Sequence, residues 1–95
     1  MKLAQRFDMT ITRDDFLRLL PAAVNHVPFT VSGEDIFYVE DARSWRMNLL
    51  PLPELRIALV RLERHRLTLE FENYEADEIA AFSKRFELYF RRGGG

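Results

Sequence analysis

The feature that most constrains the fold is a single apolar row near the C-terminal end of the chain. Its side chains recur every three or four positions, which is the period of one face of an α-helix. The row consists of Ile79, Phe82, Phe86, Tyr89 and Phe90. Acidic residues occupy the start of this stretch and arginines its end, as the helix dipole favours. The sequence therefore predicts a long C-terminal helix over residues 75–92, which needs an apolar surface to pack against.

The chain before this helix has the period-two pattern of β-strands, interrupted by one helical stretch. Thr12 and Asp15 fit a helix N-cap, so a first helix is expected from there to about Val24. The predicted strands cover residues 6–11, 27–31, 36–40, 45–49, 55–62 and 67–72. Pro51 and Pro53 make residues 50–54 a connection or a sheet edge, because proline removes a ladder donor.

These elements predict an α+β fold in one domain spanning residues 1–95. We expect a mostly antiparallel meander of about five to six strands, with the N-terminal and C-terminal helices packed on one face. The C-terminal helix should dock on the side of Leu67, Leu69 and Phe71, with Asn73 as its cap. Residues 55–62 are apolar on both faces, so they are interpreted as a strand covered on both sides. Residues 63–66 are interpreted as a turn.

Composition narrows the class of protein. The chain has 95 residues, 47% of them hydrophobic and 31% charged, which is typical of a folded domain rather than a disordered one. The net charge is −1, so no global field attracts nucleic acid or membrane. There is no cysteine and no apolar run of transmembrane length. We expect a soluble, cytoplasmic protein that does not engage a membrane.

No pattern of catalytic or metal-binding residues is visible. The only histidines are His26 and His65, and none of Ser32, Ser44 and Ser83 lies in a nucleophile motif. His65 falls in the predicted turn, where we expect it to be solvated. The sequence therefore predicts no catalytic, metal or cofactor site, and a protein that is not an enzyme.

A basic cluster is the first candidate binding feature. Arg56, Arg61, Arg64 and Arg66 lie close together in the sequence, and on one face they would form an anion patch or a nucleic-acid site. Glutamates lie on the same predicted strands, so cross-strand ion pairs are the alternative. The near-neutral charge of the whole chain argues against nucleic acid.

Aromatic side chains are the second feature, because the chain holds eight Phe, three Tyr and one Trp. A pocket between the C-terminal helix and the sheet would admit a small apolar ligand. Its predicted lining is Trp45, Phe71, Phe82, Phe86 and Tyr89. The alternative is that these rings simply fill the core of a small domain.

Apolar residues in excess of one core give the leading hypothesis. Residues 55–62 are apolar on two faces, leucines flank the prolines at residues 49–52, and two helices can leave one sheet face bare. Such surfaces are usually buried in a partner or a second copy. We therefore expect a protein-interaction module that self-associates as a homodimer, with small apolar-ligand binding as the alternative.

The chain ends in Arg91-Arg92-Gly93-Gly94-Gly95. These five residues resemble the tails of ubiquitin-like and sulfur-carrier proteins, a resemblance that implies activation of the terminal carboxylate and transfer to an acceptor. Those families have a β-grasp fold with the tail leaving a strand, whereas here the glycines follow a predicted helix. The alternative is a helix stop, since glycine is favoured just after a helix.

Overall fold

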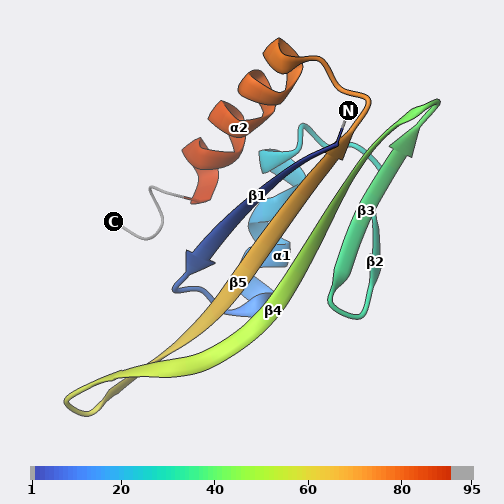
Figure 1. Cartoon of the computed structure of the whole chain (residues 1–95). Helices are drawn as coiled ribbons and strands as arrows, with labels where there is room; N and C mark the ends of the chain where they lie inside the picture. The colour runs from blue at the N-terminus through green and yellow to red at the C-terminus, as the bar shows by residue number, and fades with distance from the viewer. Residues whose placement is uncertain (1, 91–95) are drawn as a thin grey trace.

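The computed structural model describes residues 2–90, and those residues form one sheet with two helices on the same face (Figure 1). The elements are β1 (Lys2–Met9), α1 (Arg13–Ala23), β2 (Thr30–Ser32), β3 (Asp35–Glu40), β4 (Arg43–Ile57), β5 (Val60–Glu72) and α2 (Ala76–Phe90). The strand order is β1-β5-β4-β3-β2, with every neighbouring pair antiparallel. The predicted α+β fold is confirmed, with five strands. No helix within residues 2–90 has the length and apolar character needed to cross a membrane.

The apolar row of α2 forms the centre of the core, because it contacts both the sheet and α1. The ring centroids of Phe82 and Phe71 lie 5.0 Å apart, and those of Phe90 and Phe16 lie 4.8 Å apart. On β5 the buried apolar residues are Leu67, Leu69 and Phe71, which lie on the side predicted to receive this helix. Aromatic rings of α2 thus contact both the sheet and α1, its neighbour on the same face.

The two helix starts differ in how well the sequence predicted them. The Thr12 hydroxyl accepts a hydrogen bond from the backbone N–H of Asp15 at 3.1 Å, so the predicted N-cap of α1 is confirmed. Asn73 is not the cap of α2. Its side-chain amide instead donates to the carbonyl of Ala42 at 2.7 Å, and the Glu78 carboxylate accepts from the backbone N–H of Glu75 at the helix start.

The largest departures from the predicted elements lie in β4 and β5. Residues 55–62 are not one strand covered on both sides: they contain the end of β4, a two-residue turn at Ala58 and Leu59, and the start of β5. Residues 63–66 are not a turn but the middle of β5. Residues 50–54 are part of β4, and at a free edge, because β3 pairs with β4 only as far as Asn48.

The direction of the backbone groups explains why β4 tolerates its prolines. The N–H of Leu49 donates to the carbonyl of Glu34 on the β3 side, at 2.8 Å. Backbone groups alternate direction along a strand, so the nitrogen of Pro51, two residues on, faces the same side. Beyond Asn48 that side has no partner strand within residues 2–90, and a missing N–H costs no ladder bond there.

Candidate functional site

The most distinctive feature of the molecule is a β-hairpin that leaves the body of the sheet. We call residues 50–64 the arm: β1 pairs with β5 only as far as His65, and β3 pairs with β4 only as far as Asn48, so the arm has two strands. Figure 1 shows it pointing away from both helices, and it accounts for the 48 Å length of a molecule that is otherwise 25 × 22 Å. A two-stranded ribbon is marginally stable by itself.

A β-bulge keeps the apolar side chains of the arm on one face. Leu52 pairs with Arg64 and Leu55 pairs with Leu62, so two residues of β4, Pro53 and Glu54, lie opposite one residue of β5. Without this extra residue, the change from even-numbered to odd-numbered leucines would move the row to the other face. We call the row formed by Leu50, Leu52, Leu55, Ile57, Val60 and Leu62 the apolar face of the arm.

This apolar face is open to solvent. Leu50 is 42% exposed, Leu55 39%, Ile57 57% and Val60 54%, and Leu59 at the turn is fully exposed. Further along the same side of the sheet the side chains are mixed. Arg46, Thr68 and Glu70 are polar, whereas Phe37 and the 64% exposed Val39 of β3 are apolar. The arm thus carries a continuous apolar row, a patch of the kind that marks interaction sites.

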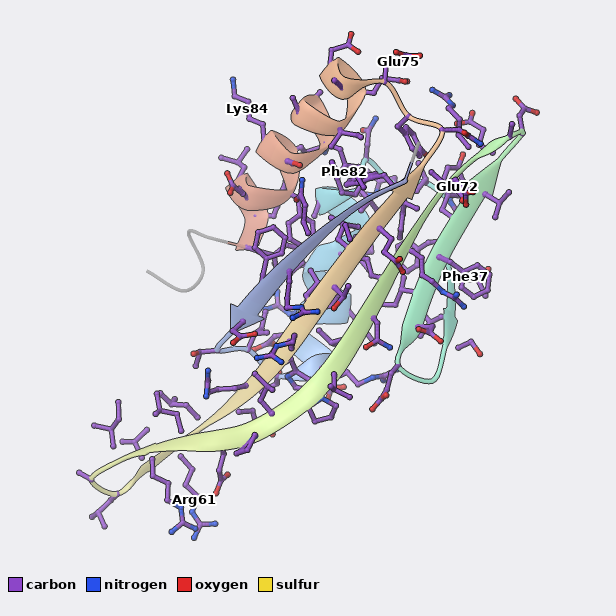
Figure 2. All side chains as sticks on the ribbon, viewed as in Figure 1. Phe37, Arg61, Glu72, Glu75, Phe82 and Lys84 are labelled. Atoms are coloured by element: carbon purple, nitrogen blue, oxygen red, sulfur yellow. The ribbon has the colours of Figure 1, made fainter. Side chains whose placement is uncertain are left out.

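The opposite face of the arm is charged. The Glu54 carboxylate lies 3.5 Å from Nε of Arg56 and 3.9 Å from Nε of Arg61, which face each other across the two strands. Figure 2 shows Arg61 projecting from the arm, far from Phe82 in the core. Exposed ion pairs of this kind contribute little to stability, so this face is available for other charges.

The four arginines of the predicted anion patch do not share one face. Arg56 and Arg61 lie on the charged face of the arm, whereas Arg64 and Arg66 lie on the face that carries the leucines. Arg66 is also engaged, since its guanidinium donates to both carboxylate oxygens of Asp8 on β1, at 2.8 and 3.2 Å. This hydrogen bond lowers the pKa of Asp8 and raises that of Arg66. The structure thus divides the set into two pairs.

His65 anchors the base of the arm. It is buried, and its Nδ1 donates to the carbonyl oxygen of Ile11 at 2.8 Å. The expectation that His65 is a solvated turn residue was wrong, because β5 runs through it. The hydrogen bond ties the segment that follows β1 to the sheet, at the level where β1 ends and the arm begins.

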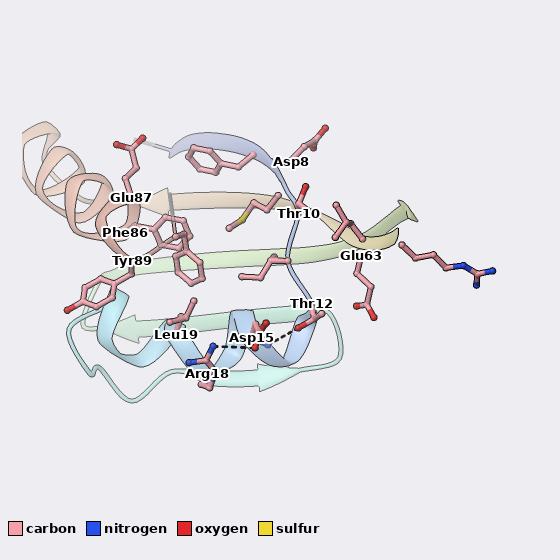
Figure 3. A pocket seen from close by; sticks show the side chains of 16 residues that line it. Asp8, Thr10, Thr12, Asp15, Arg18, Leu19, Glu63, Phe86, Glu87 and Tyr89 are labelled. Carbon is pink, nitrogen blue, oxygen red and sulfur yellow. Dashed lines mark hydrogen bonds and ion pairs between the residues drawn. The ribbon is translucent and has the colours of Figure 1, made fainter. Parts of the chain in front are cut away.

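A groove of about 960 Å³ lies beside the base of the arm, between the segment after β1 and the ends of α1 and α2 (Figure 3). Its apolar walls include Phe7, Met9, Ile11, Leu19, Tyr89 and Phe90. Its charged residues are four acids and two arginines: Asp8, Asp15, Glu63, Glu87, Arg18 and Arg61. The groove is therefore apolar inside with an acidic excess around it.

The predicted ligand pocket is distributed over two places. Phe86 and Tyr89 line this groove, at the end formed by α2. Trp45, Phe71 and Phe82 instead pack against one another in the core, with centroid distances of 5.9 Å from Phe82 to Trp45 and 5.0 Å from Phe82 to Phe71. Within residues 2–90, no three His, Asp or Glu side chains lie close enough to hold a metal ion. The Gly-Gly tail lies outside the described residues.

Comparison with protein-family models, with curated proteins and with solved structures gives no match. What the chain does is therefore inferred from its own arm and groove.

Sequence reasoning identified neither the arm nor the groove as a unit. A signal for the arm was nevertheless present: Leu50 and Leu52 alternate in one phase and Leu55 and Ile57 in the other, separated by Pro53 and Glu54. A one-residue phase shift in an alternating row is what a β-bulge produces. The groove has no comparable signal, because its walls come from segments far apart in the sequence.

Proposed function

We propose that this chain is a non-enzymatic protein-interaction module whose docking element is the arm. The observation that carries the proposal is the apolar face, a solvent-exposed row of aliphatic side chains on a two-stranded hairpin that extends beyond the pairing of β1 and β3. The proposal keeps the cytoplasmic location expected from the sequence.

Magnitudes favour docking over a purely structural role for this face. Complete burial of a Leu, Ile or Val side chain is worth about 1.5–3 kcal/mol, so covering several that are half exposed gains roughly 1 kcal/mol each. The isolated chain does not gain this burial free energy, and a two-stranded ribbon alone is only marginally stable. A partner that covers the face would gain this energy and stabilise the arm at the same time.

Site-specific photo-crosslinking in the source cells tests the proposal. A photoreactive amino acid at Ile57 lies on the apolar face, and the same group at Arg56 lies one position away on the charged face. We expect a discrete crosslinked protein from position 57 and not from position 56, and its loss when Leu55→Asp is added. Equal products from both positions, or none from position 57, would show that the apolar face is not a docking surface.

The groove supports a second candidate function, binding of a small apolar ligand. Its volume and aromatic walls suit such a molecule, and its acidic excess favours one that carries a positive charge. Trp45 is only 3% exposed and lies outside the groove, so NMR shifts of Leu19 and Tyr89 are the suitable readout. An apolar amine should shift these two signals saturably. An unchanged spectrum at millimolar amine would rule out this class of ligand.

A further inference from the structure

One strand edge of the arm can accept a further β-strand, and the other cannot. Because even-numbered residues of β4 direct their backbone groups to β5, the even-numbered residues of β5 paired with them point back to β4. Arg61 and Glu63 therefore direct their N–H and C=O groups outward. β1 ends opposite His65, so no strand within residues 2–90 lies beside them.

The other edge of the arm, that of β4, carries Pro51 and Pro53. Prolines at a strand edge prevent pairing with another strand, and natural sheets use them for this purpose. The edge of β5 at residues 60–64 has no proline. The arm is thus protected against strand addition on one side only.

The groove lies on the unprotected side. Its lining includes Arg61, Leu62 and Glu63 of that edge, and across from them Met9, Thr10 and Ile11, where the chain turns away after β1. The groove therefore occupies the position that a further strand beside β5 would take.

We propose that a second copy of this chain fills this position, with the two β5 strands pairing antiparallel about a twofold axis at Leu62. The inference rests on the arm being the docking element, as proposed above. In this register Arg61 lies opposite the partner's Glu63, and Glu63 opposite the partner's Arg61. These two residues are also the ones whose backbone groups point outward, so each pair exchanges backbone hydrogen bonds and carries opposite charges.

The neighbouring registers lack this complementarity. A twofold axis at Arg61 places two arginines opposite each other, and an axis at Glu63 places two glutamates opposite each other, both of which are unfavourable. In the Leu62 register the pairing ends with Val60 opposite the partner's Arg64, because Met9 of the partner's β1 already pairs with His65. The fully exposed Leu59 at the turn then abuts the end of the partner's β1. Leu59 then lies beside the apolar walls of the partner's groove.

Pairing in this way leaves the apolar faces of both arms on the same side of a continuous four-stranded ribbon. The dimer therefore does not bury the surface proposed for docking, but joins two such surfaces into one. A partner protein would gain twice the apolar contact from the dimer that it gains from one arm.

Charge reversal at the paired edge tests the inference by sedimentation over a micromolar concentration range. Arg61→Glu and Glu63→Arg, each alone, turn two attractive pairs into two repulsive ones, so each should weaken dimerisation by roughly tenfold or more. A mixture of the two variants should form a heterodimer, and the double variant should regain the wild-type constant. Arg56→Glu, on the same face of the arm but on β4, is the matched control and should dimerise as the wild type does.

A wild-type chain that stays monomeric, or single variants that dimerise normally, would overturn the paired edge. These results would leave the photo-crosslink from Ile57 unaffected, because that residue lies on β4, away from the paired edge. Conversely, a dimer with the expected charge dependence but no crosslink from Ile57 would retain the dimer and refute docking through the apolar face.

Discussion

The bulge at Pro53 and Glu54 leads to a prediction about two deletions. Both shorten the arm by one residue, but only one of them changes which side chains lie on its apolar face. Deleting Glu54 leaves Pro53 alone opposite Glu63, in a regular ladder, with Leu55 still opposite Leu62. Deleting Arg56 also gives a regular ladder of the same length, but it moves Leu55 opposite Arg61 and brings Glu54 opposite Leu62. The first deletion preserves the apolar face, and the second places a carboxylate in it.

The two deletions should have similar effects on folding. The arm lies outside the core, and the ion pairs of Glu54 are exposed, so each deletion should change the free energy of unfolding by no more than about 1 kcal/mol. Their effects on docking should differ. Loss of one leucine from the contact costs about 1–2 kcal/mol, and a carboxylate buried at the contact costs several kcal/mol more. The Arg56 deletion should therefore weaken partner binding by at least roughly a hundredfold.

Thermal unfolding, cross-strand NOEs and the photo-crosslink from position 57 together measure these effects. The Glu54 deletion should retain the Leu55–Leu62 NOE and the crosslink, and the Arg56 deletion should lose both while unfolding at a similar temperature. If the two deletions gave equal crosslink yields, the face on which Leu55 lies would not matter for docking. That result would refute the reasoning from the bulge.

Three further predictions concern the body of the fold and the turn. Phe86→Ala removes a ring that is 3% exposed and packs against Phe16, so it should cost about 3–5 kcal/mol in chemical denaturation, whereas Leu88→Ala, at a 58% exposed site, should change stability by less than about 0.5 kcal/mol. The pKa of Asp8 is below its ordinary value of 3.8, chiefly through its hydrogen bond from Arg66. The stability that ionised Asp8 contributes is therefore present at neutral pH and lost as the pH falls through the folded-state pKa. Asp8→Asn should make the free energy of unfolding fall less steeply toward acid pH. Ala58 has φ +54°, so Ala58→Gly should increase amide protection at the tip of the arm in hydrogen exchange. Equal losses at the two α2 sites, an unchanged fall toward acid pH, or lower protection at the tip would contradict these three in turn.

Local patterns in the sequence predicted the parts of the fold whose contacts are repetitive. The apolar row of α2, the Thr12 cap and the hairpin of β2 and β3 each follow from residues close together in the chain. In that hairpin Gly33 takes φ +60° at the turn, as a glycine there predicts. These features needed no knowledge of distant contacts.

The arm was missed for a physical reason. Its turn has Ala58 rather than glycine or asparagine in the left-handed conformation, so the usual hairpin signal is absent. The prolines indicated an edge, but whether an edge lies at the rim of the body or on a free hairpin depends on where β1 and β3 stop. His65 was predicted to lie in a turn because its neighbours are charged. Those neighbours, Arg64 and Arg66, instead lie on the opposite face of β5.

The most direct test of the paired edge is disulfide formation by single cysteines, since the chain has none of its own. On the twofold axis, Leu62 and the partner's Leu62 form a non-hydrogen-bonded pair, with Cα atoms about 4.5 Å apart, within the range that a disulfide spans. Val60 is more exposed, but the two copies of it would lie about 13 Å apart along the paired strands. We predict that Leu62→Cys forms a disulfide-linked dimer under mild oxidation much faster than Val60→Cys. Equal rates, or a faster reaction at position 60, would contradict the register and with it the proposed dimer.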